Sequence, residues 1–461
     1  MSDTKSRTHR LLTIAAVLVL VGAISGVAYV RRYGFPARAA GEPAGPAILS
    51  IVVSGDTAGW LVPCGCTTNQ SGGLLRRGTL VRQLESRGPL LVVDAGGAAA
   101  GTSAYHKLKF EAILQGELAM NLAAHNLGAS EVAFEPDYLR EVAYRLHVPF
   151  VSANVRDKSG ITLAEPIRIV EHDLARIGVT GVLSRRFAHD QWQVDEPRDA
   201  LLKVIAANKS RYDVLLVLAY LPEEELRQLA AALPEADLII GGPTGQAIAP
   251  QPVGSTLVAS ATNKGKFLVH LETEGPRGRP AWSGKIVELN ESFADDAQQQ
   301  ANVRRYLASL DRRDIPAAEA GFAAMLPVGL PRDYRLAGND ACISCHKNDC
   351  TLWSGSKHGH AWQTLQGKGY HVDSYCQQCH TTGYGLPGGF ESARRSAALT
   401  NVGCESCHGP SAAHVRSVKT KTPFAAKDQC DRCHDRENSP QFDYPVYWPK
   451  IKHGEPATTG G

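Results

Sequence analysis

One five-residue motif, Cys-x-x-Cys-His, occurs four times between positions 342 and 434 of this chain. Two cysteines three positions apart reach the two vinyl groups of one haem and form thioether bonds, and the histidine that follows lies beneath the iron. The pattern therefore predicts four covalently attached haems of the c type. The predicted thioether residues are Cys342 and Cys345 (motif 1), Cys376 and Cys379 (motif 2), Cys404 and Cys407 (motif 3), and Cys430 and Cys433 (motif 4). The predicted proximal iron ligands are His346, His380, His408 and His434.

Two other chemistries use similar cysteine pairs. Zinc ribbons and knuckles also carry Cys-x-x-Cys pairs, but zinc does not require a histidine directly after each pair. A disulfide framework leaves the four histidines equally unexplained. We therefore favour haem, and because covalent attachment of this kind takes place outside the cytoplasm, we expect the chain beyond residue 30 to be periplasmic.

The second axial ligand of each iron must come from the remaining histidines of segment 336–461. These are His358, His360, His371, His414 and His453. His358 and His360 are two positions apart, so we expect only one of them to bind an iron. Four bis-histidine irons are therefore possible and would suit electron transfer, whereas an iron left open could bind a small ligand and perform chemistry. The segment is too short to build a conventional core around four haems, so we expect the haems to supply its apolar interior.

Residues 11–30 form an uncharged apolar run with basic residues on both sides. A helix of about 20 residues spans a bilayer, and a signal-peptide core is usually shorter, at about 7–15 residues. We therefore predict one transmembrane anchor at 11–30, a cytoplasmic tail at 1–10 and a linker at 31–47. Cleavage after Ala37-Arg38-Ala39 is the alternative. This prediction makes the protein anchored in the inner membrane, with its bulk in the periplasm.

Residues 48–290 alternate short apolar runs with amphipathic stretches, which is typical of α/β folds. The predicted strands are Ile48–Val53, Leu90–Asp94, Phe150–Ser152, Val179–Leu183, Val214–Ala219 and Asp237–Ile240. The predicted helices are Leu75–Ser86, Phe110–His125, Asp137–Leu146, Pro197–Asn208 and Glu223–Leu233. Residues 291–335 are expected to form a helical and then proline-rich connector to a small, mostly irregular and α-helical domain at 336–461.

The C-terminal segment resembles the cytochrome c-554 family of tetrahaem cytochromes over roughly residues 340–455. The matching stretches are Trp353 to His358, Cys379 to Gly383, Gly403 to Pro410 with His414 after it, Ser439 to Asp443, and Tyr447 to His453. The resemblance implies stacked haem pairs and an electron-shuttling role, and some members keep one five-coordinate haem. It also favours His358 over His360, so the distal candidates are His358, His371, His414 and His453.

The N-terminal domain resembles the calcineurin-like metallophosphoesterase domain of 5′-nucleotidases, a layered α/β sandwich. The family carries D-x-H, G-D, G-N-H-E, a histidine after a strand, and G-H-x-H, and these residues hold two metals that activate water. This chain keeps Asp56, Asp94 and Glu131. It has lost ligands at Ala58, Gly97, Ala129, Ser130 and Tyr220, and both histidines between Gly242 and Gly245. A two-metal site needs several nitrogen or oxygen ligands for each ion, and the residues that remain are too few. We expect the fold without a dinuclear metal centre and without phosphatase activity.

Pro63-Cys64-Gly65-Cys66 lies in the first loop of that domain, and Cys350 belongs to none of the four motifs. Two cysteines separated by one glycine can bind a soft metal, approach a haem iron or form a redox disulfide; a structural disulfide or packed thiols are the simpler interpretation. Our hypothesis is that Cys64 and Cys66 form a thiol or metal site where the two domains meet. The dispersed His106, His125, His147, His172, His189 and His270 are expected to be structural.

The whole chain has a formal net charge of +3, with 43% hydrophobic and 21% charged residues. This is ordinary globular composition, and the near balance of charge gives no reason to expect a nucleic-acid partner. We predict an electron-transfer protein with an inactive phosphoesterase-like domain as a scaffold or docking module. Its expected partners are other cytochromes or quinone-linked membrane complexes. The alternative is an oxidoreductase acting on a small nitrogen or sulfur compound, at an open haem or at Cys64 and Cys66, and retained hydrolase activity is a third, weaker hypothesis.

Overall fold

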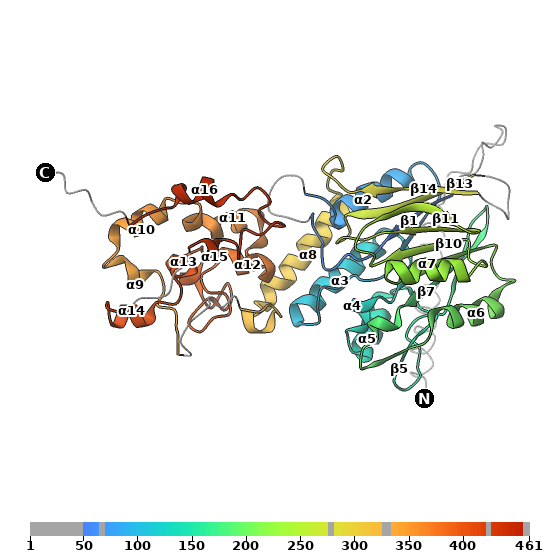
Figure 1. Cartoon of the computed structure of the whole chain (residues 1–461), viewed down its shortest axis with the longest axis horizontal. Helices are drawn as coiled ribbons and strands as arrows, with labels where there is room; N and C mark the ends of the chain where they lie inside the picture. The colour runs from blue at the N-terminus through green and yellow to red at the C-terminus, as the bar shows by residue number, and fades with distance from the viewer. Residues whose placement is uncertain (1–48, 64–69, 275–280, 325–332, 421–425, 455–461) are drawn as a thin grey trace, which may run out of the picture. The chain divides into compact units, whose positions relative to one another are not determined.

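The computed structural model describes residues 49–63, 70–274, 281–324, 333–420 and 426–454 (Figure 1). The predicted anchor at 11–30, the cleavage site at Ala37 to Ala39, and Cys64 and Cys66 all lie outside these residues. No helix within the described ranges is both long enough and apolar enough to cross a membrane. Residues 47–461 form one compact unit, and every described residue belongs to it. Below, residues 49–324 are called the α/β region and residues 333–454 the motif region.

The first sheet of the α/β region has the strand order β14-β13-β1-β2-β3-β4. Its strands are β1 (Leu49–Ser54), β2 (Leu90–Asp94), β3 (Leu122–Asn126), β4 (Phe150–Val151), β13 (Phe267–Glu274) and β14 (Ala281–Glu288). Strands β1 to β4 are parallel neighbours, and β13 and β14 extend the sheet as an antiparallel hairpin. Every residue of β1 is buried, as expected for a parallel strand covered on both faces.

The second sheet has the strand order β11-β12-β10-β9-β7-β6. Its strands are β6 (Arg168–Glu171), β7 (Arg176–Leu183), β9 (Val214–Tyr220), β10 (Leu238–Gly242), β11 (Ile248–Val253) and β12 (Thr256–Ser260), and β5 (Val155–Asp157) pairs separately with β8 (Trp192–Val194). One apolar cluster joins Ile51 and Val93 of the first sheet to Val179 and Leu216 of the second. The two sheets therefore pack face to face.

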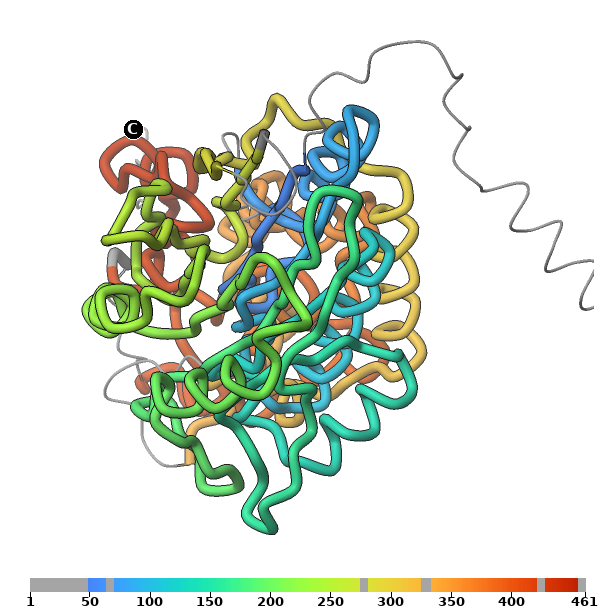
Figure 2. Tube along the Cα trace, turned by 90° about the vertical axis from the view of Figure 1, so that its right-hand side faces the viewer, coloured from blue at the N-terminus to red at the C-terminus, as the bar shows by residue number. Residues whose placement is uncertain are grey.

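Helices cover the outer faces of both sheets (Figure 1). The first sheet is covered by α2 (Gly73–Glu85), α3 (Ala104–Leu118) and α8 (Ala297–Arg313), and the second by α6 (Pro197–Asn208) and α7 (Glu223–Ala232). Helix α8 packs along α3, and the two run side by side in Figures 1 and 2. The short helices α4 (Ala129–Val132) and α5 (Pro136–Leu146) and the 3-10 turns η1 (Arg185–Phe187) and η2 (Ala317–Glu319) complete the region. The layered α/β sandwich expected from the sequence is confirmed.

The predicted helix Phe110–His125 is wrong in its second half. Helix α3 ends at Leu118, and residues 122–126 form β3 between β2 and β4. Asn121 has a φ of 58°, a left-handed conformation that asparagine tolerates better than most residues, and it turns the chain between the two elements. The apolar spacing of residues 110–125 fits a helix, but the sheet needs a strand here, and tertiary pairing outweighs local preference. Seven further strands were also missed, and all except β12 pair only in the antiparallel direction: β5, β6, β8, β11, β12, β13 and β14.

The motif region contains short helices, 3-10 turns and loops (Figure 1). Its helices are α9 (Asp340–Ile343), α10 (Lys347–Ser354), α11 (Ala361–Lys368), α12 (Ser374–His380), α13 (Cys404–His408), α14 (Ala412–Arg416), α15 (Ala426–Cys430) and α16 (Tyr444–Tyr447). Its 3-10 turns are η3 (His358–His360), η4 (Tyr370–Val372), η5 (Ala397–Leu399) and η6 (Trp448–Lys450). The mostly irregular and helical character predicted for this segment therefore agrees with its structure.

Candidate functional site

Each of the four motifs lies on or beside one short helical turn. In motif 1 the amide of His346 donates to the carbonyl oxygen of Cys342 at 2.9 Å, and in motif 4 His434 does the same to Cys430 at 2.9 Å. One helical turn brings side chains at positions i, i+3 and i+4 to the same face. Both cysteines and the histidine of a motif therefore face one side, as attachment of a single planar group requires.

The structure places three motif histidines opposite three of the distal candidates, with the paired rings tilted by 44° to 54°. The ring centroids are 6.3 Å apart for His346 and His414, 6.1 Å for His358 and His434, and 5.9 Å for His408 and His453. Two imidazoles that bind one metal from opposite sides, each with a metal–nitrogen bond of about 2.0 Å, have ring centroids about 6 Å apart. These residues therefore fit bis-histidine ligation of one iron by each pair.

Hydrogen bonds at Nδ1 orient several of these rings. The Nδ1 of His380 lies 2.8 Å from the carbonyl oxygen of Ala361. The Nδ1 of His414 lies 2.9 Å from the carbonyl oxygen of Thr420, and that of His453 lies 2.8 Å from the carbonyl oxygen of Ile451. A histidine whose Nδ1–H donates to a carbonyl keeps Nε2 as the lone-pair nitrogen, the form that binds iron. Burial also lowers the pKa of His358, His380, His408 and His434, which favours the neutral, ligating form.

Motif 2 differs from the other three. Within the described residues, no second imidazole ring faces His380 as one does in the other motifs. The remaining distal candidate, His371, lies instead against the ring of Trp362, with centroids 5.9 Å apart, and its buried Nδ1 has no hydrogen-bond partner. His360 is exposed at the surface, whereas its neighbour His358 faces motif 4.

Cysteines of different motifs touch one another. The Cys342 thiol of motif 1 is hydrogen-bonded to Cys404 of motif 3, and Cys379 of motif 2 to Cys433 of motif 4. The unassigned Cys350, on α10, also lies within hydrogen-bonding contact of Cys404. The attachment points of motifs 1 and 3, and those of motifs 2 and 4, are therefore neighbours.

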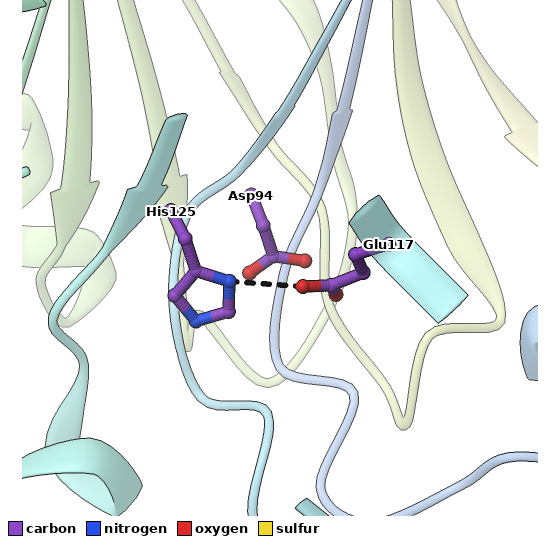
Figure 3. Close-up of side chains that lie close together, drawn as sticks. All are labelled: Asp94, Glu117 and His125. Atoms are coloured by element: carbon purple, nitrogen blue, oxygen red, sulfur yellow. Dashed lines mark hydrogen bonds and ion pairs between the residues drawn. The ribbon is translucent and has the colours of Figure 1, made fainter. Parts of the chain in front are cut away.

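The α/β region holds a second cluster of charged side chains at the ends of its first-sheet strands. Figure 3 shows Asp94 from the end of β2, Glu117 from α3 and His125 from β3, whose ligand atoms lie within 4.8 Å of one another. All three are buried, and so is Arg77 of α2, which donates to Glu117 at 3.1 Å and lies 3.6 Å from Asp94. A metal ion in this cluster would have to displace a guanidinium that already lies beside both carboxylates.

His125 is a second partner of these buried carboxylates. Its Nδ1 lies 2.9 Å from Glu117 and its Nε2 lies 3.4 Å from Glu131. Burial by itself would lower the pKa of His125, but the Glu117 and Asp94 charges and the two hydrogen bonds outweigh burial and raise it well above its usual value. In this structure the donor atoms of the cluster are thus engaged by Arg77 and His125 in a buried network of hydrogen bonds and ion pairs.

Side chains and backbone pack closely around the positions where the phosphoesterase pattern requires metal ligands. Tyr220, at the end of β9, lies so close to Gly97 that a Cβ added there would meet its ring at 2.7 Å. The retained Glu131 accepts backbone hydrogen bonds from Gly97, Ala98 and Gly128, at 2.7 to 2.9 Å. It therefore holds the loop conformation together. The retained Asp56 is bonded to Thr262 and Asn263.

Sequence reasoning missed Arg77 and Glu117 and treated His125 only as a dispersed structural residue. Two adjacent arginines in an otherwise apolar stretch, Gly72 to Leu80, were the available signal for Arg77. For Glu117 and His125 there was none, because the two residues were assigned to one continuous helix and lie on separate elements.

Comparisons with known proteins match the two regions separately. The family model for cytochrome c554 and c-prime matches residues 341–409. Cytochrome c-554 from Nitrosomonas europaea is 30% identical over 159 residues, which cover 27% of this chain and 68% of that protein. Membership in this family implies covalently bound haem c and exchange of electrons with redox partners.

The structural matches concern the fold of the α/β region. A 5′-nucleotidase precursor from Thermus thermophilus aligns with a TM-score of 0.52 at 21% identity, covering 65% of this chain and 67% of that chain. The calcineurin-like phosphoesterase YfkN from Bacillus subtilis aligns with a TM-score of 0.50 at 19% identity, covering 57% of this chain and 98% of that chain. The chain therefore belongs to the cytochrome c-554 family through its motif region, joined to an α/β region with the fold of 5′-nucleotidases and calcineurin-like phosphoesterases.

Proposed function

We propose that this protein carries electrons through four covalently attached haems, one at each motif. The observation that carries the proposal is the set of three imidazole pairs, His346 with His414, His408 with His453, and His434 with His358, with centroids 5.9 to 6.3 Å apart. Iron held by two imidazoles has no free position for a substrate and, when bound here, supplies reversible one-electron chemistry. The short helices of the motif region hold the ligands, and the Nδ1 hydrogen bonds keep the rings oriented.

The contacts between motif cysteines connect all four attachment points. Motif 1 meets motif 3 through Cys342 and Cys404, and motif 2 meets motif 4 through Cys379 and Cys433. The charge of Cys430 acts on Cys407, so motifs 3 and 4 are also neighbours. The motifs therefore neighbour one another in the order 1, 3, 4, 2, which is the order we propose for electron flow in either direction.

Haem content and one ligand substitution test this proposal. The purified holoprotein should contain four haems per chain, and His414→Ala should convert one low-spin centre into a high-spin centre in absorption and paramagnetic resonance spectra. His360→Ala, a substitution of an exposed histidine, is the matched control and should leave the spectra unchanged. Fewer than four haems, or spectra identical in His414→Ala and the parent, would overturn the assignment.

A second function, reduction or oxidation of a small nitrogen or sulfur compound, is favoured by one observation. His380 lacks the facing imidazole that the other three motif histidines have within the described residues. An iron bound at motif 2 would then keep one open position. Carbon monoxide should alter the spectrum of one reduced haem out of four, and if it alters none, every iron is closed and only the electron-carrier function remains.

We further propose that the α/β region is a catalytically inactive scaffold. Gly97 and Ala58 offer no ligand atoms, Tyr220 fills the space beside Gly97, and Arg77 and His125 neutralise the buried carboxylates. An assay with a generic phosphoester and added Mn²⁺ should give no hydrolysis above background. Hydrolysis that disappears in a Glu131→Gln variant would contradict this assignment.

The anchor and the compartment complete the proposal. The apolar run at 11–30 and the requirement for extracytoplasmic haem attachment support an inner-membrane protein with its bulk in the periplasm. Fractionation of cells that express the full chain should recover it with the inner membrane. Release of mature protein that begins after Ala39 would instead support a cleaved signal peptide.

A further inference from the structure

One buried carboxylate in the motif region is bonded by side chains that come from the α/β region. Asp373 is 4% exposed and begins helix α12, which carries motif 2. The hydroxyl of Tyr105, on α3, donates to Asp373 at 2.7 Å, and that of Tyr306, on α8, donates to its other oxygen at 3.3 Å. The backbone amide of Tyr375 completes the set at 2.9 Å.

The two phenols are buried parts of this cluster. Both Tyr105 and Tyr306 are buried, and burial, together with the charge of Asp373, raises the pKa of each phenol well above its usual value, so both keep the proton that they donate. Lys109, one turn along α3, donates to the Tyr105 hydroxyl at 2.8 Å. Lysine, phenol and carboxylate thus form a hydrogen-bonded chain that runs from α3 to the N-cap residue of the motif 2 helix.

Capping of α12 does not require a charge. Serine or asparagine would accept the same backbone hydrogen bond without the cost of burying a carboxylate. Here two phenols offset that cost, and both come from helices outside the motif region. The extra feature that aspartate supplies is a fixed negative charge three residues before Cys376.

We propose that Asp373, held by Tyr105 and Tyr306, is a positioning residue that sets the reduction potential of the haem attached at motif 2, so that the α/β region tunes that centre. The inference rests on the proposed function, because it requires a haem at motif 2. A buried negative charge beside a haem stabilises the oxidised form, which carries one more positive charge, and therefore lowers the potential. The phenols fix the carboxylate in place.

Potentiometric titration of the full-length holoprotein tests this directly. Asp373→Asn keeps the shape and the capping oxygen but removes the charge, so one of the four midpoint potentials should rise and the other three should stay. Tyr105→Phe keeps the ring and removes only the hydroxyl, and it should shift the midpoint potential of the same haem. In the Asp373→Asn background, Tyr105→Phe should shift this potential much less, because the charge that the Tyr105 hydroxyl bonds is already gone.

The same titration includes a matched control, and several of its results would contradict the inference. Tyr138→Phe removes a phenol that bonds Glu111 within the α/β region, and it should move no potential. If Asp373→Asn contains four haems with normal spectra and unchanged potentials, the inference is overturned while the proposed function stands. A parent protein without four haems would instead overturn the proposed function. Should Asp373→Asn fail to assemble, Tyr105→Phe alone decides, and unchanged potentials in that variant overturn the inference.

Discussion

The two regions of this molecule are stabilised in different ways. In the α/β region, every residue of β9 is buried, and two sheets and their helices share continuous apolar clusters. In the motif region, helices α9, α10, α14 and α16 contain no buried residue at all. The few buried apolar residues there, such as Trp362, Leu365 and Phe390, belong to the same cluster as residues of α3 and α8.

The side chains of the α/β region can stabilise its fold by themselves, whereas those of the motif region cannot. Small domains that lack a sufficient core need disulfides, metals or another addition. The motif region has four haem attachment motifs in place of a core, and its buried Trp362, Leu365 and Phe390 pack in a cluster shared with the α/β region. We therefore expect the α/β region to keep its structure when the motif region loses a haem, and the predictions below test that expectation.

The largest effect should follow from removal of one haem. Cys404→Ser/Cys407→Ser abolishes both thioether bonds of motif 3, which adjoins motifs 1 and 4 through Cys342 and Cys430. We expect three haems instead of four, loss of the cooperative thermal transition of the Soret band, and cleavage of residues 333–454 by trypsin. The far-ultraviolet transition of the α/β region should remain.

The spare thiol of α10 supplies the control for that experiment. Cys350→Ser changes a cysteine of the same region that belongs to no motif, and it should keep four haems and the parental Soret transition. If the motif 3 variant unfolds both regions together, the proposed independence of the α/β region is wrong.

The next effect concerns the buried ion pairs of the α/β region. Arg77→Met leaves Asp94 and Glu117 without their guanidinium and should lower the free energy of unfolding by about 3–5 kcal/mol, the usual cost of breaking a buried pair. Arg82→Met, on the same helix but 48% exposed, should cost less than about 1 kcal/mol. Denaturation followed in the far ultraviolet measures both, and the Soret spectrum should be the same in both variants.

The two regions also differ in how much of their structure could be predicted from the sequence. The spacing within the motifs identifies the residues that bear the chemistry, because thioether attachment demands that spacing whatever the surrounding fold. The pairing of His358 with motif 4, and the lack of a facing imidazole for His380 among the described residues, depend on how loops separated by many residues pack, and no local pattern encodes that.

In the α/β region the alternation of strands and helices indicated the architecture, but individual elements depend on the tertiary fold. Residues 122–126 carry helical spacing and form a strand because β2 and β4 pair with them. The ion-pair network of Arg77, Glu117 and His125 joins three elements, so it could be found only after the elements were placed. Departures from the ligand pattern predicted a lost metal site, yet not that Tyr220 fills it.

A smaller effect should follow from restoring the missing carboxylate of the phosphoesterase pattern. Gly97 has a φ of 85°, and a Cβ there would lie 2.7 Å from the Tyr220 ring, so Gly97→Asp combines backbone strain with overpacking. We expect a loss of about 2–4 kcal/mol in the unfolding free energy. Gly160→Asp has a similar φ of 80° with nothing within 4 Å, and it should cost about 1 kcal/mol from strain alone. Equal losses in the two variants would mean that the pocket is not packed as described.

The smallest effect is a dependence of the stability of the α/β region on pH. The pKa of buried His125 is raised above its usual 6.5, because Glu117 and Asp94 outweigh the effect of burial. The folded state therefore holds this proton more tightly than the unfolded state, so the stabilisation is fully present below pH 6.5 and is lost as pH rises through the folded pKa. The pKa of Glu117, raised by burial to about 7, acts in the same direction between pH 4.5 and about 7. Above pH 7 the slope belongs mainly to His125, and each unit of raised pKa is worth about 1.4 kcal/mol.

Thermal unfolding between about pH 7 and pH 9, followed in the far ultraviolet, measures this slope. His125→Gln should flatten it, whereas His189→Gln, a substitution of an exposed histidine of the same region, should not. The Soret transition of the motif region should respond equally to pH in all three proteins, because neither substitution lies in that region. If His125→Gln keeps the parental slope, the imidazole is neutral in the folded state, and Arg77 alone balances Asp94, Glu117 and Glu131. The cluster would then be short of positive charge, and a bound cation would become the better explanation of its structure.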